Sequence, residues 1–126
     1  MVIVVVKWSI QPDRIEDFHE FWTHEAQVQD RLGLVAEFLS EVGAKEDFPY
    51  ITWTLEDQAA APGHLYVNVG IWTDPDAFRD QIATYFNDDG PIRDFEAARR
   101  IRAVLLPKWW RIGDAPLPAA DSSGVL

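Results

Sequence analysis

The sequence predicts a single α+β domain whose strands and helices follow the order β-α-β-β-α-β. Three observations support this order. The two most regular apolar stretches, residues 2–10 and 64–73, are rich in the β-branched and aromatic residues that strands favour. Each stretch is followed by a proline and then by apolar residues about 3.6 positions apart, the spacing of an amphipathic helix. With two further strands expected, one after each helix, this is the split-βαβ order of ferredoxin-like folds.

Residues 2–10 (VIVVVKWSI) are expected to form the first strand, which Gln11 and Pro12 end. Pro12 also suits the first turn of a helix, where its missing N–H costs nothing. The apolar residues that follow keep a helical period and predict a helix over residues 12–31; they are Ile15, Phe18, Phe21, Trp22 and Val28. Gly33 is expected to end this helix, because glycine is common just past a helix C-terminus.

The middle of the chain gives a weaker pattern. Residues 36–43 are expected to form the second strand, although their alternation leaves no clean apolar face. The segments that follow are assigned to a turn at 45–49, a short extra strand at 50–54 and a loop at 56–63.

Residues 64–73 (HLYVNVGIWT) form the clearest strand pattern in the chain. Because side chains alternate across a strand, one face should carry Leu65, Val67, Val69 and Ile71, and the other Tyr66, Asn68, Gly70 and Trp72. A helix is then expected over residues 75–87, capped by Thr73 or Asp74 and opened by Pro75.

The end of the chain is expected to hold a short helix at 92–100 and the last strand at 101–112. Pro107 cannot donate to a strand ladder, so it should lie at an edge or a bulge. We therefore expect one domain over residues 1–113 and a polar, proline-rich tail over residues 114–126, either flexible or strapped across a partner.

Composition excludes several classes of function. The chain has 21 acidic and 11 basic residues, a net charge of −10 that opposes binding to nucleic acid. Five basic residues fall between Arg99 and Arg111, either as solvated side chains or as a patch for an anionic ligand. The sequence has no cysteine, no apolar run near the ~20 residues that span a bilayer, and no pattern of a signal peptide. We expect a cytoplasmic protein that does not act on membranes.

Three segments of this pattern resemble a known family: residues 4–22, residues 65–82, and the KWWR sequence at 108–111. The most specific element is an asparagine and a tryptophan four positions apart on a strand, then a short acidic-proline turn and an Ala-aromatic-Arg helix start. Its residues here are Asn68, Trp72, Asp74, Pro75, Ala77, Phe78 and Arg79. In these features the chain resembles the antibiotic biosynthesis monooxygenase (ABM) family of dimeric α+β barrels.

The resemblance implies a homodimer whose two sheets pack together, with a ligand cleft in each protomer. In the cofactor-free oxygenases of the family, the strand asparagine and tryptophan line that cleft, and they match Asn68 and Trp72. A tyrosine on the next helix often belongs to the same site, where this chain has Phe78, and Arg93 is the nearest candidate for a cleft arginine. The haem-degrading branch carries an axial histidine on the second helix, and residues 75–87 contain none.

The residues themselves leave two readings open. Asn68 lies in an otherwise apolar strand, so its amide serves either a ligand or a fixed hydrogen-bond network. Tyr66, Gly70 and Trp72 share its face and leave room for a flat aromatic ligand, or simply fill the core. Trp22, like Trp8, could close the same cavity or pack in the core. The histidines, His19, His24 and His64, show no metal-binding spacing and are expected at the surface, so we expect no metal and no cofactor.

The function expected from the sequence is a cofactor-free monooxygenase that acts on an aromatic phenol or polyketide-like substrate. Asn68 and Trp72 are the candidate catalytic residues, with the Asn68 amide expected to donate to an oxyanion that develops on the substrate. The candidate substrate-binding residues are Tyr66, Phe78, Trp22 and Arg93. Two alternatives remain: a hydrophobic-ligand carrier or cyclase-like accessory protein that uses the same cleft, and a dimerisation module with a vestigial pocket.

Overall fold

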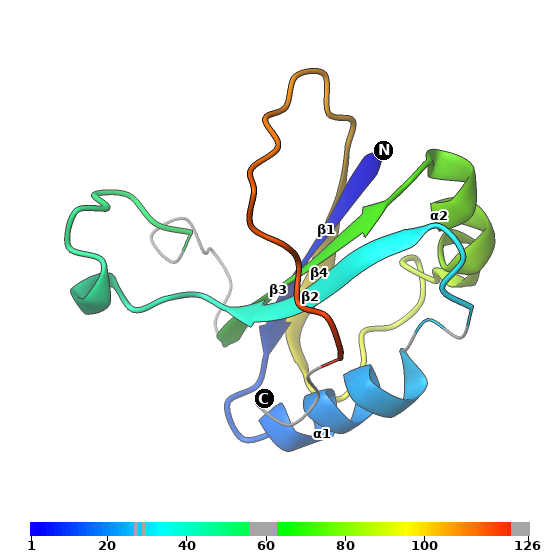
Figure 1. Ribbon diagram of the computed structural model, residues 1–126. Coiled ribbons are helices and arrows are strands. Elements are labelled where there is room, and N and C mark those ends of the chain that lie inside the picture. Colours follow the sequence, from blue (N-terminus) through cyan, green and yellow to red (C-terminus); the bar gives the residue numbers. More distant parts are fainter. Residues whose placement is uncertain (27, 29, 56–62, 122–126) are drawn as a thin grey trace.

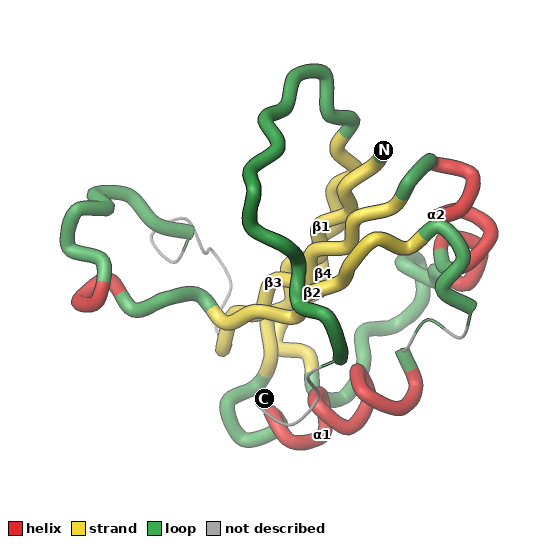
Figure 2. The backbone as a smooth tube through the Cα atoms, viewed as in Figure 1, coloured by secondary structure: helices red, strands yellow, loops and turns green. Residues whose placement is uncertain are grey.

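A four-stranded antiparallel sheet with the strand order β2-β3-β1-β4 carries the fold (Figures 1 and 2). The computed structural model describes residues 1–26, 28, 30–55 and 63–121. The strands are β1 (Val2–Ile10), β2 (Leu34–Glu41), β3 (His64–Trp72) and β4 (Glu96–Leu105). The helices are α1 (Ile15–Glu20), which continues as a π-helix over Phe21–Glu25, α2 (Pro75–Gln81), and short 3-10 turns at Lys45–Asp47 and Ala83–Tyr85. The α+β class predicted from the sequence is confirmed.

The central strand β1 is paired on both sides, with β3 and with β4. Its β-branched sequence suits this place, because such side chains pack well on a pleated surface. Every second residue is buried, from Val2 to Ile10. The strands predicted at 2–10 and 64–73 are observed within one residue of those bounds.

Both helices cover the same face of the sheet. Phe18 of α1 packs against Trp8 and Tyr66, at ring-centroid distances of 5.1 and 5.2 Å. Phe78 of α2 packs against Trp72 at 6.0 Å. The opposite face carries the half-buried side chains of Leu65, Val67, Val69 and Ile71, which are separated from the buried set as predicted.

The first helix is shorter than the predicted span of residues 12–31. It begins at Ile15, because residues before it form a turn closed by the Arg14 N–H and the Gln11 carbonyl (2.9 Å), and its π-helical part ends at Glu25. Residues 27 and 29 lie outside the described part of the chain.

Gly33 is therefore not the end of that helix. It adopts a left-handed φ of 83° just before β2, and its carbonyl accepts from the Thr73 N–H at 2.8 Å. A Cβ at this position would lie 2.5 Å from the Cβ of Ala77. Glycine is required here by the turn and by the close approach of α2.

The observed bounds of the last strand differ from two predictions. β4 begins at Glu96, so the short helix predicted at 92–100 is wrong, and the strand predicted at 101–112 ends at Leu105. The sequence EAARR has little strand propensity by itself, and pairing with β1 overrides that preference. Pro107 follows the strand and interrupts no ladder bond. The extra strand predicted at 50–54 is also absent from the described residues, which run as loop there.

Two other elements shift or shorten. β2 covers Leu34–Glu41 instead of 36–43, and the helix predicted at 75–87 is α2 followed by a 3-10 turn. The cap of α2 is Asp74, whose side chain accepts from the Ala77 N–H at 2.8 Å. No helix of the described residues is long and apolar enough to cross a bilayer.

The segment after β4 loops away from the sheet and returns past β2 (Figure 1). Its last described residue, Asp121, accepts two hydrogen bonds from the Arg31 guanidinium, at 2.9 and 3.0 Å. This ion pair holds the described end of the tail beside the start of β2. Residues 122–126 lie outside the described part, and the division into a domain and a tail stays a prediction.

Candidate functional site

A cavity of about 650 Å³ lies between the helix-covered face of the sheet and the helices. All four strands contribute to it, together with the π-helix, α2 and the loop before β4. The strand residues that line it are Val4, Val6, Trp8, Glu37, Asn68, Gly70, Trp72, Arg100 and Arg102. The described part of the chain therefore holds a chamber large enough for a small organic molecule.

Strand register sets the floor of this cavity. Val6 of β1 stands opposite Asn68 of β3 on one side and Arg102 of β4 on the other. Gly70 stands opposite Glu37 of β2. A Cβ on Gly70 would lie 3.3 Å from Nε1 of Trp72, so the glycine leaves room for this indole.

Asn68 belongs to the cavity lining, and its amide has one partnered and one unpartnered atom. The side chain is 8% exposed, and its Nδ2 donates to Oε1 of Glu37 at 3.0 Å. Its Oδ1 is buried and has no hydrogen-bond partner among the described residues. A buried polar atom without a partner costs about 1–3 kcal/mol. The amide oxygen is thus an acceptor for which a ligand donor would be favourable.

Glu37 is the acidic partner of this amide, and the sequence pattern does not mark it as a site residue. Burial raises the pKa of its carboxyl, while the hydrogen bond from Asn68 and the charge of Arg31 lower it in part. The available signal was the alternation of Glu37, Leu39 and Glu41 along one face of a strand. Neither side of that strand is clearly apolar, so the alternation does not indicate which face is buried.

Aromatic side chains form much of the remaining wall. Trp72 and Phe78 are almost fully buried, and Phe78 also packs against Phe86 at 5.9 Å. Trp22 of the π-helix lines the same cavity. The structure therefore brings together Asn68, Trp72, Phe78, Trp22 and Arg93 of the residues named from the sequence.

Tyr66 lies apart from them and is not a lining residue. Its hydroxyl donates to Oε1 of Glu41 (3.2 Å) and lies 3.0 Å from Nε2 of His19. Burial, with a smaller contribution from Glu41, raises the pKa of Tyr66 to about 12. His64 contacts the same carboxylate at 3.2 Å. Tyr66 thus belongs to a separate polar cluster, and His19 is half-buried in it instead of lying free at the surface.

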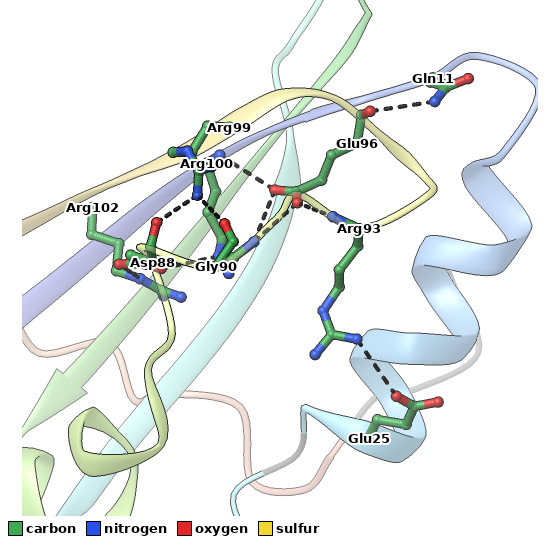
Figure 3. A network of polar contacts seen from close by, with 9 residues as sticks. All are labelled: Gln11, Glu25, Asp88, Gly90, Arg93, Glu96, Arg99, Arg100 and Arg102. Carbon is green, nitrogen blue, oxygen red and sulfur yellow. Dashed lines mark hydrogen bonds and ion pairs between the residues drawn. The ribbon is translucent and has the colours of Figure 1, made fainter.

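Two of the five basic residues noted between Arg99 and Arg111, Arg100 and Arg102 of β4, form an arginine wall of the cavity (Figure 3). Asp88 accepts from Nε of Arg100 (3.2 Å) and from Nε of Arg102 (2.8 Å). Glu96, with no exposed side-chain surface, accepts from Nη1 of Arg100 at 3.1 and 3.0 Å. Arg99 instead donates to the backbone carbonyls of Asp88 and Gly90. The period-2 placement of Arg100 and Arg102 was obscured by the helix expected there.

This wall carries compensated charge. The Arg102 guanidinium stacks over Phe86 at 3.7 Å, and that of Arg93 over Phe21 at 4.0 Å. The hydrogen bond from Arg102 is the main reason that the pKa of Asp88 is lowered. Because Asp88 and Glu96 already pair with the two β4 arginines, a strongly anionic ligand would have to compete with them. The wall suits a neutral or weakly acidic aromatic molecule better.

A second buried polar atom without a partner, Nε1 of Trp8, belongs to another lining residue. Two residues of the cavity lining thus carry a buried polar atom without a partner among the described residues, a donor on β1 and an acceptor on β3. The described residues contain no group of three or more histidine, aspartate or glutamate side chains placed to hold a metal ion.

The chain matches no protein-family model and no curated protein. Among solved structures it is similar to SnoaB, a cofactor-independent oxygenase from Streptomyces nogalater, crystallised as an Asn-to-Ala variant. The match has 18% sequence identity and a TM-score of 0.50, and it covers 86% of this chain and 94% of SnoaB. The chain therefore has the ABM-like α+β fold that its sequence predicts.

Proposed function

We propose that the cavity binds a flat phenolic molecule and that the protein oxidises it with O₂, without a metal, flavin or other cofactor. The observation that carries the proposal is the buried Oδ1 of Asn68, an acceptor without a partner among the described residues, in a cavity of about 650 Å³ lined by aromatic rings. The ABM-like fold is consistent with a small-molecule substrate. A cytoplasmic location is part of the proposal and is favoured by the cysteine-free sequence.

In this proposal the phenol O–H donates to Oδ1 of Asn68, and the ring lies against Trp72 and Phe78. The sequence suggested the reverse polarity, with the amide as donor to an oxyanion. The contact between Nδ2 and Glu37 favours the acceptor role, since the amide N–H already has a partner. Fixed walls of this kind accelerate reactions mainly by positioning.

The chemistry resides in the substrate. Loss of the phenolic proton gives an anion that passes one electron to O₂, and the resulting radical pair forms a C–O bond at the para carbon. Protonation gives a hydroperoxide, and loss of water breaks its O–O bond and leaves a quinone. One oxygen atom enters the product, and the other leaves as water with the O–H and ring C–H hydrogens.

The alternative is a carrier that binds the same molecule without reaction. Phe78 favours it, because an aromatic ring without a hydroxyl at this wall cannot exchange a proton with the ligand. Both functions need the cavity, so binding alone does not separate them.

Oxygen consumption separates the two functions. The purified protein with anthrone and no added cofactor should consume O₂ above background, and Asn68→Ala should slow this by about 10²-fold, the cost of a misplaced reactant. Ser40→Ala, on the other face of the sheet, is the control and should keep the rate. Quenching of tryptophan fluorescence by anthrone without O₂ uptake would replace the oxygenase with the carrier.

A further inference from the structure

We propose that Glu37 is the group that accepts the substrate's proton in this cavity. The inference rests on the proposed oxygenase function, which requires removal of a proton before O₂ reacts. It assigns that step to a β2 carboxylate, on the strand at the edge of the sheet beside β3.

The geometry places this carboxylate beside the expected position of the substrate hydroxyl. Glu37 lines the cavity, and its Oε1 accepts from Nδ2 of Asn68 at 3.0 Å. The other atom of the same amide, Oδ1, is the free acceptor. Gly70, which faces Glu37 across the strand pair, has no side chain to separate the carboxylate from the cavity. A hydroxyl bound at Oδ1 of Asn68 would be separated from Glu37 by no more than the amide group that joins the two contacts.

The other carboxylates that line the cavity are poorer candidates. The side chains of Glu25 and Asp80 are 67% and 61% exposed, and each has an arginine within 4.0 Å. Asp30 is exposed and accepts from the Leu32 N–H at 3.0 Å. Glu37 is half-buried, and it accepts its hydrogen bond from a neutral amide.

The basicity of the Glu37 carboxylate agrees with this assignment. Burial raises the pKa of Glu37, and a stronger base takes a proton from a phenol with a smaller uphill step. Arg31 acts in the opposite direction, and its guanidinium is held by Asp121. The other charged groups of the cavity are Glu25, Asp30, Asp80, Arg93, Arg100 and Arg102.

Glu37 takes up one proton and returns it within each turnover. The substrate hydroxyl first turns its hydrogen from Oδ1 of Asn68 to the Glu37 carboxylate. Its O–H bond, or the C–H bond of the keto tautomer, then breaks, and the proton moves to that carboxylate. After the anion has reduced O₂ and the C–O bond has formed, the carboxylic acid returns the proton to the peroxide. Loss of water then leaves the quinone and an ionised Glu37, ready for the next turnover.

Glu37→Gln tests the step with little change in shape. The glutamine oxygen can still accept from Asn68, but the side chain is no longer a base. The matched control is Glu41→Gln, which changes a carboxylate on the same strand and the same face that lies outside the cavity lining. Two rates are measured for each protein: O₂ uptake with anthrone, and anaerobic exchange of the acidic anthrone C–H protons in D₂O, followed by NMR.

We expect Glu37→Gln to slow both rates by about 10²–10⁴-fold, the usual contribution of a positioned general base, and Glu41→Gln to change them less than about twofold. The wild-type rates should fall as pH drops through the raised pKa of Glu37, since only the ionised carboxylate accepts a proton. This acid limb should be missing in Glu37→Gln.

The two rates also separate this inference from the oxygenase proposal. Exchange that depends on Glu37 without O₂ uptake would support the proton acceptor and overturn the oxygenase. Full O₂ uptake and exchange in a folded Glu37→Gln protein would overturn the proton acceptor and leave the oxygenase standing. Absence of both rates in the wild-type protein would overturn both.

Discussion

Phe78 shows how one side chain limits the chemistry of the cavity. Its ring packs against both Trp72 and Phe86, but it brings no hydroxyl to the cavity. Many members of the ABM family, which the sequence resembles, have a tyrosine at this position. A proton acceptor elsewhere in the same cavity, such as Glu37, would compensate for the missing phenol.

Phe78→Tyr should therefore have more effect where Glu37 is absent. In the Glu37→Gln background the added phenol offers a second route for the proton, and we expect O₂ uptake to recover by about tenfold, below the ~10²–10⁴-fold worth of a positioned base. In the wild-type background the rate should change by less than that. Oxygen-electrode rates of the wild type, Phe78→Tyr, Glu37→Gln and the double variant measure the coupling between the two positions. Equal effects in both backgrounds would mean that the two positions act independently.

The candidate site was partly predictable at the level of residues. Asn68 and Trp72 were visible because a polar amide interrupts an apolar strand and a known motif surrounds it. Glu37 was hidden because it lies on an edge strand with mixed faces, where sequence alternation does not tell inside from outside. Tyr66 shares its strand face with Asn68, yet it lies farther along the strand, over α1, and contacts His19.

At the level of elements, β4 depends on its carboxylate partners. Glu96 accepts from the backbone N–H groups of Arg93 and Arg100 as well as from the Arg100 guanidinium. The Arg100 side chain is 8% exposed, so its charge is compensated inside the protein and not by water. These contacts fix the loop before β4 and the start of the strand together.

Glu96→Ala should consequently destabilise the folded protein strongly. The substitution leaves the buried Arg100 guanidinium with Asp88, which also pairs with Arg102, and it leaves the N–H groups of Arg93 and Arg100 without their carboxylate acceptor. We expect a loss of about 3–5 kcal/mol in the free energy of unfolding. Asp76→Ala is the control: it breaks the exposed ion pair with Arg79, and should change stability by less than about 1 kcal/mol. Urea denaturation of both variants measures the difference. Similar small losses in both would mean that water reaches Arg100.

The same elements explain which parts of the fold the sequence predicts. β1 and β3 have strong alternation and β-branched residues, so local pattern and final structure agree. β4 begins with Glu-Ala-Ala-Arg-Arg, which favours a helix locally and becomes a strand only through its pairing with β1 and the contacts of Glu96. The first helix is shorter than predicted. Its apolar period continues past Glu25, and that period alone does not show where the helix ends.

For the whole molecule, the uncovered face of the sheet suggests a second copy of the chain. Its apolar residues come from all four strands and include Val5, Phe38, Val69, Ile71 and Leu105. Large apolar side chains are also exposed on the two segments that project from the sheet in Figure 1, among them Tyr50, Trp53, Trp109 and Ile112. Exposed apolar surface of this extent is typical of an interface.

We therefore predict a homodimer with about twice the 14.4 kDa mass of the chain. Val69→Asp places a charge in the middle of the uncovered face and should give the monomer mass in light scattering at micromolar concentration. Thr84→Asp adds the same charge on an exposed turn and should leave the dimer intact. A monomer mass for the wild-type protein would refute the prediction.

The ion pair between Arg31 and Asp121 links the C-terminal segment to the acid tolerance of the proposed reaction. Arg31 lowers the pKa of Glu37, and Asp121 neutralises part of that influence. Asp121→Asn should therefore lower the pKa of Glu37 and move the acid limb of the pH–rate profile to lower pH, whereas Arg31→Gln should move it to higher pH. Proteolytic trimming before residue 121 would then act as Asp121→Asn does, so that the length of the C-terminal segment would adjust the pH range of the proposed oxidation.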